Sequence, residues 1–286
     1  MFRDVEIYVS KFLQFSLVDT PVNYWIKQAF YSQFKESGEW QKVSKLGTYT
    51  TNFSADYMLR KVAFWLVWIG LIIYAFFLAP PDSPNTFKLI ENLSTGHWQG
   101  INPLIVALFN VMGILPMIYG CFMFIDGINQ KIPAWLFVSA SFAVGAFALL
   151  PYLALRSPLS DISQAPNQKT SYQNNNLVKI CDSRITGVVL TLIVVSLITY
   201  AFRTGEWSDF FQQWKSSRFI HVMSLDFCVL SLSVGALLGD DMARRGIKKS
   251  WIFWLTTLIP LFGPLIYLCW RPPLLINYTK AAEITL

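Results

Sequence analysis

The chain has 286 residues, of which 54% are hydrophobic and only 14% are charged, and its formal net charge is +6. A water-soluble domain usually carries about 25% charged residues, so this composition excludes an ordinary soluble enzyme. The modest positive charge gives no reason to expect a nucleic-acid partner. We therefore expect an all-α polytopic membrane protein whose first partner is the lipid bilayer.

Residues 1–61 are expected to form amphipathic helices. Thr20 and Pro21 are typical of a helix start and Gly38 of a helix end, and apolar residues recur between them at helical spacing. Such a helix lies flat at the headgroup level or caps the bundle, and the sequence leaves both open. The segment has no unbroken apolar run, so we expect no cleaved signal peptide.

Six apolar stretches follow, most of them near the roughly 20 residues that cross about 30 Å of hydrocarbon. The six predicted spans are Val62–Ala79, Pro103–Ile125, Pro133–Leu155, Gly187–Phe202, Phe219–Leu238 and Trp251–Trp270. Residues 62–270 are thus predicted to be one six-helix transmembrane domain, followed by a tail of residues 271–286.

The loops between these spans give two further expectations. Trp207, Phe210, Phe211 and Trp214 recur at helical spacing, which predicts another interfacial helix within residues 203–218. With six spans, the basic residues near span ends number ten on the face of the N-terminal tail and nine on the other. The positive-inside rule needs a bias, so orientation is left open.

Asp226 is the most unusual residue within a span, because a charge there must face protein or water. It is either a proton-handling or ligand-orienting carboxylate, or a buried acid satisfied by a neighbouring hydroxyl or amide. His221 lies about 140° around the same helix, so the two share no face. The only other histidine is His97. The count excludes a bis-histidine haem and leaves His221 as an axial contact to a chlorophyll-like pigment or as an interfacial histidine.

Two spans contain helix-breaking residues. Asn110, Gly113 and Pro116 mark a kink in the second span, and Pro260–Pro264 marks one in the sixth. Broken helices are typical of transport sites, and also of bundles that bend around neighbouring helices.

Asp240 and Asp241 close the fifth span. Paired aspartates resemble the metal–diphosphate sites of prenyl-transferring enzymes, which need further carboxylates at helical spacing. Arg244 and Arg245 follow instead, so we expect ion pairs rather than a metal site. The four cysteines form no C-x-x-C pair, and we expect neither a disulfide nor a cysteine-bound metal.

Small residues at four-residue spacing predict close helix packing. Ser231, Gly235 and Gly239 follow one face of the fifth span, and Ser141 and Gly145 one face of the third. Such faces let two helix backbones approach within lipid. The partner helix belongs either to this chain or to another protein.

Several motifs resemble an uncharacterised family of membrane proteins of cyanobacteria and plastids. They are Asn102–Gly113, Pro133–Trp135, Gly145–Arg156, Asp226–Phe227, Asp240–Arg245, Phe262–Leu268 and Arg271–Pro273. The resemblance implies a photosynthetic organism and a thylakoid location, without an established activity. His221, Asp226 and Phe262–Pro264 are more distantly similar to plant membrane proteins required for neoxanthin formation, which implies carotenoid chemistry.

Three functions therefore stand as hypotheses. The first is a non-enzymatic protein, without catalytic residues, that stabilises membrane partners as a subunit or assembly factor of a photosynthetic complex and contacts chlorophyll or carotenoid. The second is a membrane enzyme of isoprenoid or carotenoid metabolism with Asp226, His221, Asn110 and Asp241 around one cavity. The third is a small-solute or proton-coupled transporter that uses Asp226 and the broken spans.

Overall fold

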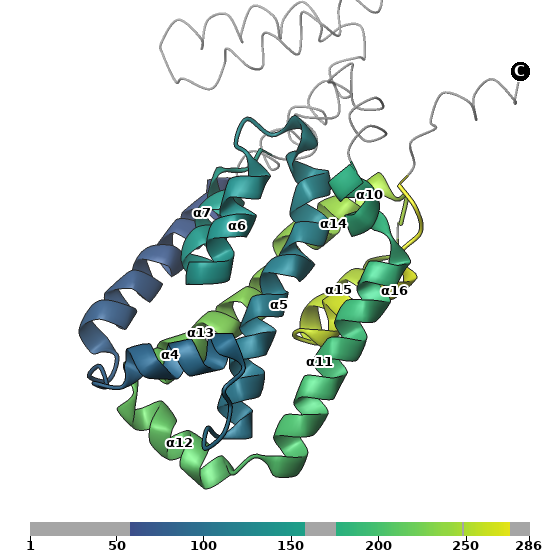
Figure 1. Cartoon of the computed structure of the whole chain (residues 1–286). Coiled ribbons are helices and arrows are strands. Elements are labelled where there is room, and N and C mark those ends of the chain that lie inside the picture. The colour runs from purple at the N-terminus through teal and green to yellow at the C-terminus, as the bar shows by residue number, and fades with distance from the viewer. Residues whose placement is uncertain (1–57, 158–175, 248, 275–286) are drawn as a thin grey trace, which may run out of the picture. The chain divides into compact units, whose positions relative to one another are not determined.

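The computed structural model describes residues 58–157, 176–247 and 249–274 (Figure 1). The chain divides into two units, Met1–Arg60 and Lys61–Leu286, and nearly all of the described residues belong to the second. Its described residues are helical, without a strand. The amphipathic helices predicted within residues 1–57 and most of the predicted tail lie outside the described residues.

Four helices are long and apolar enough to cross a membrane. They are the first helix (Met58–Leu78, ending in the π-helical turn η1, Tyr74–Leu78), α5 (Pro103–Asp126), α11 (Arg184–Thr204) and the continuous pair α13 (Arg218–Ser233) and α14 (Gly235–Arg244). The prediction of an all-helical fold with helices long and apolar enough to span a membrane is confirmed in the described residues.

The third predicted span, Pro133–Leu155, is not one helix. It consists of α6 (Ala134–Val144) and α7 (Ala146–Leu155), and the chain turns back between them at Gly145, where φ is 53° and ψ is −125° (Figure 1). Only glycine adopts this conformation readily. The Tyr152 hydroxyl, near the end of α7, donates to the carboxylate of Asp126 at the end of α5 over 2.8 Å. The stretch therefore returns to the end of α5 from which it departed.

The sixth predicted span, Trp251–Trp270, behaves in the same way. It consists of α15 (Ser250–Leu258) and α16 (Phe262–Trp270), joined by a turn in which Leu261 has a φ of 63°. At the end of α16, Nη1 of Arg271 lies 3.5 Å from Oδ2 of Asp241 in the last turns of α14. The prediction of one crossing helix is wrong for both stretches, and each is a hairpin of two short helices.

The same order of elements occurs twice in the described chain. The first repeat has the helix Met58–Leu78, the short helix α4 (Thr86–Thr95), α5 and the hairpin α6–α7. The second repeat has α11, the short helix α12 (Trp207–Ser216), the pair α13–α14 and the hairpin α15–α16. The first helices of both repeats have 21 residues, and both short helices have 10. The 3-10 turn η2 (Gly127–Asn129) and α10 (Asn176–Asp182) complete the described elements.

Individual side chains repeat with the elements. In each repeat a tyrosine hydroxyl bonds to the aspartate that lies 26 residues before it, and an arginine follows four residues after the tyrosine. The three corresponding pairs are Asp126 and Asp241, Tyr152 and Tyr267, and Arg156 and Arg271. This match in order, length and contact indicates an internal duplication. Because each hairpin returns to its side of entry, both repeats run in the same direction and are parallel repeats.

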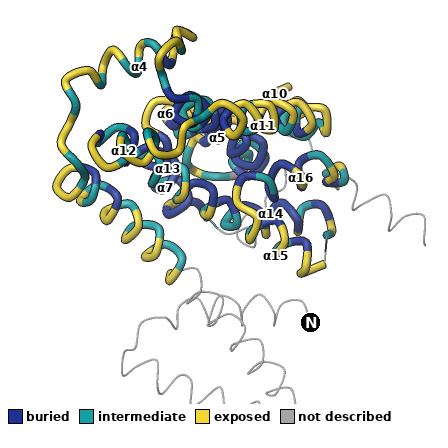
Figure 2. The backbone as a smooth tube through the Cα atoms, turned by 90° about the horizontal axis from the view of Figure 1, so that it is seen from below, coloured by how far each residue is buried: buried dark blue, intermediate teal, exposed yellow. Residues whose placement is uncertain are grey.

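The core lies where the two repeats meet around α5. Ile118, Tyr119, Phe122 and Met123 of α5 are fully buried or nearly so, and α5 contacts α11, α13 and α14 of the second repeat. The outer faces of α11 and α15 expose large apolar side chains (Figure 2). Apolar faces of this kind suit helices that contact lipid.

A helix occurs where the aromatic spacing of residues 203–218 predicts one. This helix, α12, connects the end of α11 to the start of α13 and buries none of its residues fully. Its position at the membrane interface stays a prediction.

Candidate functional site

Asp226 lies on α13 at the tip of the first hairpin. Its side chain is buried, with 6% of the residue exposed, and Oδ1 accepts a hydrogen bond of 2.7 Å from the backbone N–H of Ala146. Ala146 is the first residue of α7, and the free N–H groups and dipole of a helix start favour a negative charge. The carboxylate therefore faces protein, and its partner is a backbone amide.

Two further facts distinguish Asp226 from the other buried acids. No ion pair found among the described residues includes it. The corresponding position in the first repeat is Val111, which is buried and apolar. The carboxylate is thus a feature of the second repeat alone, and packing does not require it at this position.

His221 lies at the start of α13, near the face of α4 and α12. Its Nδ1 donates to the carbonyl of Trp214 over 3.0 Å if the ring is neutral, and its Nε2 then accepts from the Tyr74 hydroxyl over 2.9 Å. The ring also stacks on Trp214 with the centroids 4.2 Å apart. Both nitrogens have partners, so the geometry gives an axial pigment contact no support.

Asn110 does not join Asp226. Its side-chain amide donates 2.8 Å to the carbonyl of Val106 on its own helix. Asp241 is near the end of α14 and His221 near the start of α13, so these two lie at opposite ends of one long helical pair. The hypothesis that Asp226, His221, Asn110 and Asp241 surround one cavity is therefore wrong, since helix geometry separates them.

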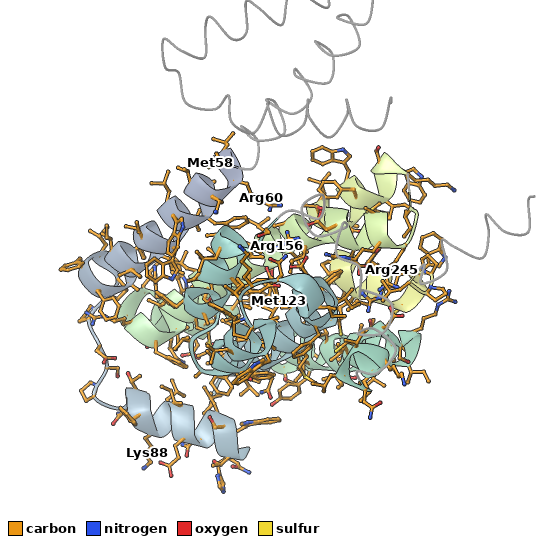
Figure 3. The ribbon with its side chains drawn as sticks, turned by 90° about the horizontal axis from the view of Figure 1, so that it is seen from above. Met58, Arg60, Lys88, Met123, Arg156 and Arg245 are labelled. Atoms are coloured by element: carbon orange, nitrogen blue, oxygen red, sulfur yellow. The ribbon has the colours of Figure 1, made fainter. Side chains whose placement is uncertain are left out.

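A second cluster of polar groups lies at the face where both hairpins begin and end. Arg156 bonds to Asp126 through Nε over 2.9 Å and through Nη2 over 2.7 Å, and it also pairs with Asp240. Arg244 reaches the same Asp126 over 2.9 Å. We name these four residues the inter-repeat clasp, because Asp126 and Arg156 belong to the first repeat and Asp240 and Arg244 to the second. Figure 3 views this face, with Arg156 labelled.

The neighbouring ion pairs lie within the second repeat or join it to α10, where Asp182 lies. Arg245 pairs with Asp241 over 2.8 Å and with Asp182 over 2.6 Å, and the Tyr267 hydroxyl donates 2.8 Å to Asp241. Of the ion pairs expected within this loop, Asp241–Arg245 is present, whereas Asp240 pairs with Arg156 and Arg244 with Asp126 of the first repeat. In the described residues no group of three or more His, Cys, Asp or Glu could hold a metal ion.

The arginines at the hairpin ends also cross between repeats. Nη1 of Arg156 donates 2.9 Å to the carbonyl of Ala236, and Nη1 of Arg271 donates 3.3 Å to the carbonyl of Cys121. Ala236 and Cys121 occupy corresponding positions on the long helices of the two repeats. Each repeat therefore caps the other in the same way.

Nearby carboxylates keep these guanidinium groups charged. Burial alone would lower the pKa of Arg156, but Asp126 and Asp240 raise it above its ordinary value. Asp241 and Asp182 raise the pKa of Arg245 against burial in the same way. A raised arginine pKa means that the guanidinium groups stay charged as the pH rises, so mild alkali does not break these ion pairs.

The small-residue faces pack within this chain. Added side-chain atoms at Gly235 and Gly239 would meet Thr257 and Phe253 of the second hairpin, and one at Gly145 would overlap the Asp226 carboxylate. Ser141 is buried and bonds to the carbonyl of Val138 on its own helix, and Ser231 is buried on α13. These glycines therefore allow close packing of the hairpins within this chain, so the small-residue pattern does not by itself imply a partner protein.

Sequence reasoning missed Arg156, Arg271 and the two tyrosines. The available signal was the motif Tyr-Leu-x-x-Arg, which occurs at Tyr152–Arg156 and again at Tyr267–Arg271, each time at the end of an apolar stretch. A motif that recurs at the ends of two similar apolar stretches points to a duplication.

Comparison of the chain with known protein families, with curated proteins and with solved structures finds no match in any of the three. The function must therefore be argued from the geometry alone.

Proposed function

We propose that this protein is a proton-coupled transporter of a small solute, in which the two repeats are the moving halves. The proposal adds that the four long helices cross the membrane and that both hairpins enter and leave it on one face. The observation that carries it is the buried carboxylate of Asp226, which has no basic partner in the described part of the chain and lies at the tip of a broken helical element.

The arrangement of repeats supports this proposal. Transporters are often built from internal repeats, and their sites lie near the membrane midplane where helices are interrupted. Here the interruption at Gly145 meets Asp226 of the other repeat, so one contact joins both halves at the hairpin tip.

The chemistry of Asp226 supplies a reason for proton coupling. A carboxylate within a membrane is costly when charged, and a helix start stabilises that charge. Protonation removes the charge and weakens the bond to the Ala146 N–H. The hairpin tip is then freer to separate from α13, and the neutral acid is free to face a different environment.

The test uses purified protein in liposomes that enclose a pH-sensitive dye. Amino acids, carboxylates, sugars and inorganic anions are added one class at a time, with wild type beside Asp226→Asn. We expect one class to acidify the wild-type lumen and the variant to lose that response by about 100-fold or more. If folded wild type responds to no class, or if the variant responds like wild type, the proposal fails.

A second candidate is the non-enzymatic partner-binding protein. A hollow of about 280 Å³ between α14 and α15 favours it, lined by residues that include Gly239, Met242, Phe253 and Trp254. An apolar side chain of a neighbouring membrane protein would fit there. Gentle detergent extraction should then yield a larger complex, and a Gly239→Phe variant should release the partner. A thylakoid location and a role in photosynthesis rest on the motif resemblance alone.

A further inference from the structure

We infer that the inter-repeat clasp is a gate, closed in this structure, at the face where both hairpins begin and end. The inference rests on the proposed transport function, because a gate needs a path to close. Its members are Asp126, Arg156, Asp240 and Arg244, and the ion pairs Arg156–Asp240 and Arg244–Asp126 each join one repeat to the other.

The clasp is placed to control separation of the repeats at this face. Arg156 and Asp126 are both almost fully shielded from solvent, with side-chain exposures of 0% and 1%, and Asp240 retains 24%. Water therefore reaches the group through Asp240 first. Because Asp240 is partly solvated and its partners are buried, we expect the clasp to begin to open at Asp240.

Buried ion pairs suit a gate energetically. Removing charges from water costs nearly as much as their attraction returns, so a balanced cluster fixes geometry without adding much net stability. Four aspartates (Asp126, Asp182, Asp240, Asp241) face four arginines (Arg156, Arg244, Arg245, Arg271) at this face. When the repeats separate, water replaces each lost partner.

The opposite face is joined by a different set of contacts between repeats. Asn102 donates to Asp209 and to the carbonyl of Glu206, each over 2.7 Å, and Arg218 donates 3.0 Å to the carbonyl of Pro80. Tyr74 and His221 add a further bond there. No ion pair found in the described chain crosses between the repeats at that face. The two faces are therefore held by separate sets of contacts, as alternate opening requires.

The experiment measures the exposure of Cys121. Cys121 is buried on α5, and its backbone carbonyl accepts a hydrogen bond from Arg271 of the other repeat. Replacing Cys181, Cys228 and Cys269 by serine leaves it as the single thiol, since the chain has four cysteines. The rate of reaction with a membrane-impermeant maleimide then reports how often this face opens.

Arg244→Gln removes one of the two ion pairs that join the repeats. Arg245→Gln is the matched control, because its buried ion pairs lie within α14 or reach α10 and none of them joins the two repeats. We expect Arg244→Gln to raise the reaction rate about tenfold and Arg245→Gln to change it less than about threefold. Asp240→Asn, at a partly exposed position, repeats the test where Arg244→Gln folds poorly. Unfolding temperatures are measured for each variant.

Two outcomes would overturn the gate: wild-type rates in both Arg244→Gln and Asp240→Asn, or equal acceleration in Arg245→Gln. Neither outcome depends on a transported solute. Loss of solute-driven acidification in Asp226→Asn with unchanged Cys121 labelling in the clasp variants would retain the transporter and remove the gate. Faster labelling without any solute response would retain the clasp as an opening contact and remove the transporter.

Discussion

Gly145 and Asp226 form one fitted pair of residues. The backbone at Gly145 has a positive φ, and the carboxylate of Asp226 occupies the space that a side chain would need. Sequence reasoning identified Asp226 as exceptional because an acid in an apolar helix is rare. It did not identify the partner, because a backbone N–H leaves no trace in the sequence.

Replacing Gly145 with alanine should destabilise the protein by about 3 kcal/mol or more, because the added atom meets both an unfavourable backbone conformation and the carboxylate. Gly70→Ala is the control, since its added atom meets nothing within 4 Å and alanine is the better helix former. Thermal unfolding in detergent measures both. Equal unfolding temperatures for the two variants would show that the tip is not built as described.

In each hairpin one tyrosine donates a hydrogen bond to an aspartate of the long helix that precedes the hairpin. Tyr152 bonds to Asp126 and Tyr267 to Asp241, both over 2.8 Å. Hydropathy averaged along the sequence shows an apolar stretch of spanning length at each hairpin. It does not show that the chain reverses within that stretch. The reversal depends on local backbone geometry at Gly145 and Leu261, so composition predicted the helices and missed their connection.

Tyr152→Phe and Tyr267→Phe should each lower stability by about 1–3 kcal/mol, because each leaves a buried carboxylate with one donor fewer. The two losses should be similar, since the contacts correspond, and nearly additive in the double variant. Tyr200→Phe, at an exposed position, should have little effect. A large loss in only one of the two hairpins would contradict the matched roles.

The hairpins change the orientation argument for the whole molecule. With six spans the basic residues divide almost evenly. In the described residues from Lys61 onward, returning hairpins instead place nine basic residues on one face: Lys61, Lys131, Arg156, Lys179, Arg184, Arg244, Arg245, Lys249 and Arg271. The other face has Lys88, Arg203, Lys215 and Arg218. Nine against four is a clear bias, so the positive-inside rule predicts that the clasp face is cytoplasmic.

Glu91→Cys on α4 should therefore react with an impermeant maleimide in intact bacterial cells that express the protein. Lys249→Cys, before the second hairpin, should react only after the cells are opened. Both residues are exposed on the protein, so the result depends on which side of the membrane the maleimide can reach and not on burial. The reverse pattern would place the clasp outside the cell and contradict the charge argument.

The most direct test of the fold is whether the two ends of one hairpin lie on the same side of the membrane. Lys131→Cys and Lys179→Cys bracket the first hairpin, and both positions are exposed. In sealed vesicles of one orientation, we predict that an impermeant maleimide labels both or neither. Labelling of one position alone would mean that residues 134–155 cross the membrane once. That result would contradict the repeat, the gate and the proposed transport mechanism.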